Sequence, residues 1–174
     1  MRSKTSKVAL CGVIAALSVV VLFLTGVVPV ATIALPAVAG CFLIAVVAET
    51  DVRSGVAVYA IVSVLAALLV PDREATLFYI VFFGYYPALY GTLSRIRNSV
   101  ARWAAKLLVF NAAAVLEALL AVWLLGIPLA EMLPFIPVFL LLMNAVFILY
   151  DLALNGLIVF YIRRLHPFVR KYLK

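Results

Sequence analysis

The sequence predicts an all-α membrane protein with six transmembrane helices and both termini in the cytoplasm. Of its 174 residues, 68% are hydrophobic and only 12% are charged, and the mean hydropathy is +1.27. Too few polar groups remain to cover a surface in water. The basic residues lie in short blocks between long apolar segments, which is the pattern of a chain that crosses a bilayer several times.

Six apolar segments are separated by polar or proline-containing stretches. They cover residues 8–28, 33–48, 55–70, 77–93, 103–125 and 137–162. Each is near the roughly 20 residues that a helix needs to cross the hydrocarbon core, although the second and third are short. We expect the first to be an uncleaved helix rather than a signal peptide. No linker or repeat divides the chain, so we expect a single integral membrane domain over residues 1–174.

The distribution of charge predicts the orientation. With the amino terminus in the cytoplasm, thirteen of the fourteen Lys and Arg residues lie inside and only Arg73 lies outside. The main inner loop carries Arg95, Arg97 and Arg102, and Lys106 lies just beyond it. An odd number of helices would remove this bias, so the charge distribution favours six helices. We expect residues 163–174 to form a basic amphipathic tail at the inner surface, with His166 exposed to solvent.

The fourth segment carries a stripe of aromatic residues. Tyr79, Phe83, Tyr86 and Tyr90 recur at spacings of four, three and four residues. On a continuous helix they share one face. Such a face packs a helix bundle and anchors it at the membrane interface, or it forms one wall of a ligand pocket. The sequence leaves both interpretations open.

Two carboxylates lie deep in the last two segments. Glu117 is eleven residues from Lys106 and Asp151 is twelve from Arg163, which places each roughly 16–18 Å from the inner boundary of the membrane. Ionisable groups at that depth are costly and are functional candidates by default. A structural hydrogen bond between helices is the alternative role.

The last segment carries a polar stripe. Asn144, Asp151 and Asn155 are separated by seven and four residues, so they share one helix face that we expect to point inward. Asn111 on the fifth segment is the expected partner. Hydrogen bonds between helices, of order 1 kcal/mol each, would hold the two segments in register. The outer members of the stripe could instead bind a polar solute.

The first segment carries a stripe of small residues. Ala9, Gly12 and Ala16 are separated by three and four residues and form a narrow groove. Such a groove suits close helix packing. The partner helix belongs either to the same chain or to another subunit.

The sequence lacks the motifs of the main enzyme classes. It contains no GxxxxGK[ST], HExxH, GxSxG or CxxC pattern. Cys11 and Cys41 lie inside apolar segments, so we expect neither a disulfide nor a metal site. We therefore expect no enzymatic activity, no cofactor and no metal. An intramembrane hydrolase built on Glu117 and Asp151 has no further support, and the basic blocks fit membrane topology better than nucleic-acid binding.

The pattern as a whole resembles the substrate-binding S components of bacterial energy-coupling factor (ECF) vitamin transporters. The resembling features are the opening KVALCGVIAALSVVV, six apolar segments in 174 residues, two termini predicted inside and a proline-bearing first outer loop. In that family an Ala-x-x-x-Ala motif on the first helix contacts the transmembrane T component. The nearest counterparts here are Ala9 with Val13, Cys11 with Ala15, and Gly12 with Ala16. None of these pairs has alanine at both positions.

The resemblance implies a substrate-capture subunit in the cell membrane. It would bind a small micronutrient, such as a vitamin or a related heterocycle, from the outer side. The implied pocket lies in the outer halves of the later helices, capped by residues 28–33 and 71–76. By the same resemblance the substrate-binding residues are Tyr79, Phe83, Tyr86, Glu117 and Asn144. The implied partners are a T component, contacted through Ala9, Gly12 and Ala16, and two ATPase subunits supplied as separate chains.

A non-transport scaffold is the alternative. The small membrane subunit of a cell-shape complex shares this size and helix count. In that case the aromatic and small-residue faces serve protein partners, and no solute pocket exists.

Overall fold

The computed structural model describes residues 4–28, 31–126 and 136–166, and every regular element in these ranges is helical. The first half contains α1 (Lys4–Phe23), η1 (Leu24–Gly26), α2 (Ala34–Cys41), α3 (Leu43–Glu49) and α4 (Val52–Leu69). The second half contains α5 (Arg73–Phe78), η3 (Tyr79–Phe83), α6 (Tyr86–Leu93), α7 (Ser99–Leu125), α9 (Ile136–Phe160) and η5 (Tyr161–Leu165).

The predicted all-helical class is confirmed for the described residues, but the helices differ in continuity from the six expected spans. Four runs are long and apolar enough to cross a membrane: Thr5–Gly26, Val52–Leu69, Ser99–Leu124 and Leu140–Leu165. The second predicted segment is divided at Phe42 into α2 and α3, and the fourth is divided into α5, η3 and α6. The predicted tail beyond residue 166 and most of the stretch at 126–137 lie outside the described residues.

Local sequence signals set several helix ends. The Asp51 carboxylate accepts a 2.7 Å hydrogen bond from the Ser54 amide at the start of α4, and this bond lowers the pKa of Asp51. Asp72 and Asn98 cap α5 and α7 in the same way. Gly126 ends α7 with a φ of 68°, a conformation that glycine adopts without steric cost.

The break in the fourth segment also has a local cause. Because proline has no N–H and its ring clashes with the preceding turn, α6 begins anew with Pro87 in its first turn. Before it the helix widens into a π-turn, in which the Gly84 amide donates a 2.7 Å hydrogen bond to the Tyr79 carbonyl. The carbonyl of Ile80 instead accepts a 2.7 Å hydrogen bond from the Tyr59 hydroxyl on α4. A Cβ atom at Gly84 would collide with the Tyr59 ring, so this contact requires glycine.

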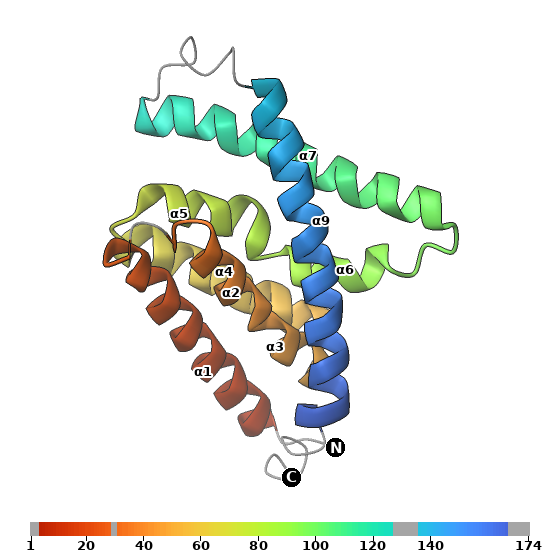
Figure 1. The fold of residues 1–174 in the computed structure, drawn as a ribbon. Coiled ribbons are helices and arrows are strands. Elements are labelled where there is room, and N and C mark those ends of the chain that lie inside the picture. Colours follow the sequence, from red (N-terminus) through yellow and green to blue (C-terminus); the bar gives the residue numbers. More distant parts are fainter. Residues whose placement is uncertain (1–3, 29–30, 127–135, 167–174) are drawn as a thin grey trace.

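Two groups of buried side chains form the core. The first joins α1, α2, α3 and α4 around aliphatic residues such as Leu22, Val46 and Val62. The second joins η3 and α6 to α7 and α9 through aromatic rings. In Figure 1, α1 to α4 lie together on one side and α7 crosses the upper part of α9. The start of α1 and the end of η5 lie at the same end of the molecule (Figure 1).

The outer faces of α7 and α9 are strongly apolar. Leu108, Trp123 and Leu141 are each more than 70% exposed. In water this surface would be unfavourable, whereas lipid tails are as apolar as these side chains. The four long apolar helices and this surface are consistent with a multi-pass membrane protein.

Candidate functional site

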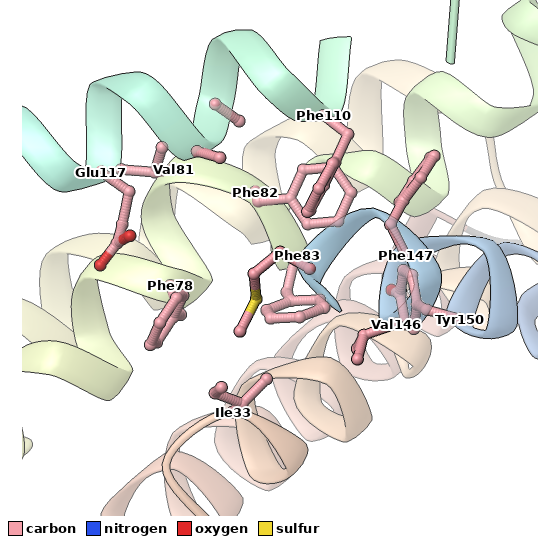
Figure 2. A pocket seen from close by; sticks show the side chains of 13 residues that line it. Ile33, Phe78, Val81, Phe82, Phe83, Phe110, Glu117, Val146, Phe147 and Tyr150 are labelled. Carbon is pink, nitrogen blue, oxygen red and sulfur yellow. The ribbon is translucent and has the colours of Figure 1, made fainter. Parts of the chain in front are cut away.

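An apolar cavity lies among η3, α7 and α9, with a volume of about 50 Å³ (Figure 2). Apart from Ile33, the side chains that line it come from α5 with η3, from α7 and from α9. These are Ile33, Phe78, Val81, Phe82, Phe83, Phe110, Ala113, Ala114, Glu117, Met143, Val146, Phe147 and Tyr150.

Three phenylalanines from three different elements form the buried floor of the cavity. The rings of Phe110 on α7 and Phe147 on α9 are stacked, with centroids 4.6 Å apart and an interplanar angle of 10°. Phe82 on η3 meets Phe110 edge-on at 5.2 Å. Such pairs contribute roughly 0.5–1.5 kcal/mol each beyond their area burial. The floor is therefore a packed and rigid part of the core.

The rim of the cavity is more accessible than its floor. Ile33, Phe78 and Met143 are half-buried, and Val146 is exposed. Of the two loops expected to cap the pocket, residues 28–33 contribute Ile33 to the lining, although residues 29 and 30 lie outside the described part of the chain. Residues 71–76 contribute no lining side chain.

The two expected capping loops are joined to each other. The Thr32 hydroxyl donates a 3.2 Å hydrogen bond to the Asp72 carboxylate. Asp72 also caps α5, which leads directly into the π-turn. The position of residues 31–33 at the rim is thus linked to the element that supplies the floor.

Glu117 is the one acidic residue among the described side chains of the lining. It is half-buried on α7 and lies at one edge of the cavity, on the side of Phe78 and away from Phe147 and Tyr150 (Figure 2). Within the described ranges no side chain or backbone group forms a hydrogen bond or ion pair with its carboxylate. This carboxylate thus lies without a partner from the described residues at the edge of a phenylalanine-rich cavity.

The structure brings only two of the five expected substrate residues into this lining, Phe83 and Glu117. Tyr79 is fully buried in the first core group, with its ring centroid 6.2 Å from that of Tyr59. Tyr86 and Asn144 are engaged in hydrogen bonds elsewhere, as described below. The expectation of one continuous aromatic face fails because the π-turn rotates the residues after Tyr79 relative to it.

Asp151 belongs to a buried polar cluster next to the cavity. The Lys106 ammonium donates hydrogen bonds of 2.9 and 2.7 Å to the two Asp151 carboxylate oxygens. The Tyr86 hydroxyl donates a third bond of 2.6 Å to the same carboxylate. Lys106 and Asp151 are only 4% and 3% exposed. This arrangement pairs both charges in a setting where an unpaired charge would be very costly.

The placement of Lys106 corrects the expectation that it lies at the cytoplasmic boundary of the fifth segment, because its side chain is buried against Asp151. Because α7 begins at Ser99, this lysine lies two turns inside the helix. Its ammonium also lies 4.2 Å from the centre of the Tyr90 ring and 5.4 Å from that of Trp103. Asp151 is therefore tied to Lys106, and it forms no dyad with Glu117.

The predicted partnership between Asn111 and Asn144 is confirmed. Their amides exchange two hydrogen bonds of 2.9 and 3.1 Å across α7 and α9. With the Phe110 and Phe147 stack and the Lys106 and Asp151 pair, this contact fixes where α7 crosses α9. Asn155, expected on the same inward stripe, is exposed, because α7 crosses α9 and contacts only part of its length (Figure 1).

The small-residue stripe on α1 has no partner among the described residues. Ala9, Gly12 and Ala16 are all exposed, and a Cβ atom at Gly12 would have no neighbour within 4 Å. The stripe is therefore not used for packing within the described part of this chain.

A second polar cluster lies where α3 ends and η5 begins. The Glu49 carboxylate accepts a 3.1 Å hydrogen bond from the Tyr161 hydroxyl and lies 2.7 Å from Nδ1 of His166. Glu49 is 5% exposed and His166 is half-buried. The expectation that His166 is a solvated tail residue is thus wrong, because Glu49, 117 positions earlier, binds it.

The described residues contain no group of three or more His, Cys, Asp or Glu side chains arranged to hold a metal ion. Comparison of the chain with protein-family models, with curated proteins and with solved structures gave no match. The described lining of the cavity thus combines apolar walls, aromatic faces and one carboxylate, and small-molecule sites are built from groups of these kinds.

Proposed function

We propose that this protein is the substrate-capture subunit of an ECF-type importer, which binds a small micronutrient such as a vitamin or related heterocycle and delivers it to a T component with separate ATPases. The observation that carries the proposal is the cavity among η3, α7 and α9, in which phenylalanine faces surround a space bordered by a carboxylate that has no hydrogen-bond or ion-pair partner among the described residues. Apolar walls with a few polar groups are typical of small-molecule sites.

Binding requires the cavity to open. Its 50 Å³ is far below the roughly 300–1,000 Å³ of typical ligand pockets. The floor is held by the Phe110 and Phe147 stack and, one turn earlier on α7, by Lys106 and Asp151. The rim is looser, because Phe78 and Met143 are half-buried and methionine has three rotatable side-chain bonds. Solute therefore enters by displacing the rim, while the ion pair keeps the floor in place.

Two further observations support the transport assignment. The exposed stripe of Ala9, Gly12 and Ala16 offers a surface on which a helix of the T component can pack closely. We also propose six membrane crossings with both termini in the cytoplasm. The charge bias of the sequence supports this topology, as does the position of the start of α1 and the end of η5 at one end of the molecule (Figure 1).

Native mass spectrometry of the protein purified from its own membranes in mild detergent tests the proposal. We expect a bound small molecule, and we expect a T component and ATPases to be enriched in the same preparation. Ala114 lines the cavity and Ala112 lies exposed on the same helix, so they offer a matched pair of variants. Ala114→Phe should abolish the bound mass, whereas Ala112→Phe should retain it.

The same experiment separates transport from the scaffold function. Repeated absence of a bound solute and of ATPases would overturn the proposal. If other membrane proteins are enriched instead, and alanine at Glu117 changes no solute uptake, the scaffold function is supported.

A further inference from the structure

The charges around the cavity define a class of solute, and this inference rests on the proposed function. We infer that the site accepts a molecule with a slender apolar or aromatic body and a single cationic nitrogen, and that it discriminates against carboxylates and phosphates.

Glu117 favours a solute that carries a positive charge. Its carboxylate borders a space walled by phenylalanine, and no hydrogen-bond or ion-pair partner is present in the described part of the chain. A half-buried carboxylate without a partner is unfavourable, so a ligand that brings an ammonium or a protonated ring nitrogen gains a charge-assisted hydrogen bond there. Phe78 lies beside Glu117 (Figure 2), where a ring face can also attract the cation.

Anionic solutes find no counterion in the lining. The thirteen lining residues include no Lys, Arg, His, Asn or Gln, and Tyr150 is the only one besides Glu117 with a nitrogen or oxygen atom in its side chain. Lys106 lies one helical turn beyond Phe110 and is already bound by both oxygens of Asp151. The amides of Asn111 and Asn144 are bonded to each other. A carboxylate or phosphate would therefore lose its hydration without compensation and would also face Glu117.

The shape of the cavity limits the rest of the molecule. The floor rings come from η3, α7 and α9 and are pinned by their mutual contacts. Space is gained only where Phe78, Met143 and Val146 can move aside. A planar ring or a narrow chain fits between such walls, with its nitrogen at the Glu117 edge, whereas a broad polar molecule such as a sugar does not.

Equilibrium binding to the full-length protein in nanodiscs tests this class with three probes that share one skeleton: 3-phenylpropylamine, 3-phenylpropanol and 3-phenylpropanoate. We expect the amine to bind the wild type most tightly and the carboxylate not to bind measurably. Glu117→Gln should weaken binding of the amine by at least about tenfold, because a charge-assisted hydrogen bond is lost. Glu117→Asp keeps the charge and should retain the preference for the amine. The control is Asp51→Asn, because Asp51 is an exposed acid outside the lining and asparagine can still cap α4, so the affinity should stay unchanged.

The outcomes distinguish this inference from the proposed function. Equal or tighter binding of the carboxylate, no binding of any of the three probes, or an affinity for the amine that Glu117→Gln leaves unchanged would each overturn the inference. An anionic solute that copurifies with the protein and its ATPases would also overturn it, while leaving the transport function intact. Glu117-dependent binding of the amine without any copurifying T component or ATPase would support the solute class and count against the transporter assignment.

Discussion

The buried pair of Lys106 and Asp151 yields the sharpest stability prediction. The perturbation removes each charge in turn, with Lys106→Met and Asp151→Leu, and then both together. Each single variant leaves one buried charge without its ionic partner, since both residues are less than 5% exposed. After Lys106→Met, Asp151 keeps only the hydrogen bond from Tyr86. After Asp151→Leu, Lys106 keeps only its contacts with the rings of Tyr90 and Trp103.

The geometry sets the expected magnitude. Breaking a well-formed buried ion pair by removing one partner costs about 3–5 kcal/mol, whereas replacing both partners with apolar side chains of similar volume is often nearly neutral. We therefore expect each single variant to lower the free energy of unfolding by about 3–5 kcal/mol. The free energy of unfolding should fall less in the double variant than in either single variant, because the double variant leaves no unpaired charge in the core.

Equilibrium unfolding in mixed micelles with increasing SDS, followed by circular dichroism, measures these differences. Arg97→Met is the control, because Arg97 is exposed and should change stability little. Single variants that cost less than about 1 kcal/mol, or a double variant whose loss equals the sum of the two, would refute the coupling of these charges inside the protein.

Three other predictions follow from the fold. Gly84→Ala should destabilise the protein by about 1–3 kcal/mol because its Cβ meets the Tyr59 ring, whereas Gly91→Ala, which meets nothing within 4 Å, should be neutral or stabilising in the same unfolding assay. Asp51→Ala should lower stability at neutral pH. Since the folded pKa of Asp51 is lowered, the contribution of its carboxylate is present above its unfolded pKa of roughly 3.9 and is lost as the pH falls through the folded value, so thermal melts of wild type and variant should converge below that pH. In a background without Cys11 and Cys41, Arg73→Cys should react with an impermeant maleimide on intact cells, and Arg97→Cys only after permeabilisation; the reverse pattern would contradict the proposed orientation.

The helical spacing of residues correctly predicted a contact between two residues that lie on the facing sides of two regular helices. The pairing of Asn111 with Asn144 followed from the spacing of polar residues within two long helices, and both helices are continuous at these positions. The helical class followed in the same way from composition. Phe83 and Glu117 were expected in a pocket from the resemblance to S components and from their depth, and both line the cavity, although their role in binding a solute stays a prediction.

Residues whose partners lie far away in the chain could not be placed from the sequence. Lys106 follows a basic stretch and has the local pattern of a loop residue, yet its partner is 45 positions away. The π-turn depends on Pro87 and on the Tyr59 hydroxyl from another helix, so a regular helical period misplaced Tyr79 and Tyr86. Asn155 fits the polar stripe of α9, but the crossing of α7 over α9 ends before that residue is reached (Figure 1).

The most direct test of the account is an experimental structure of the protein with its copurified solute in a lipid nanodisc. We expect ligand density between Phe82, Phe110 and Glu117, with Phe78 and Met143 displaced outward and the Lys106 and Asp151 pair unchanged. Density at any other location, or a cavity that stays closed while the solute is bound, would contradict the assignment of this cavity as the binding site.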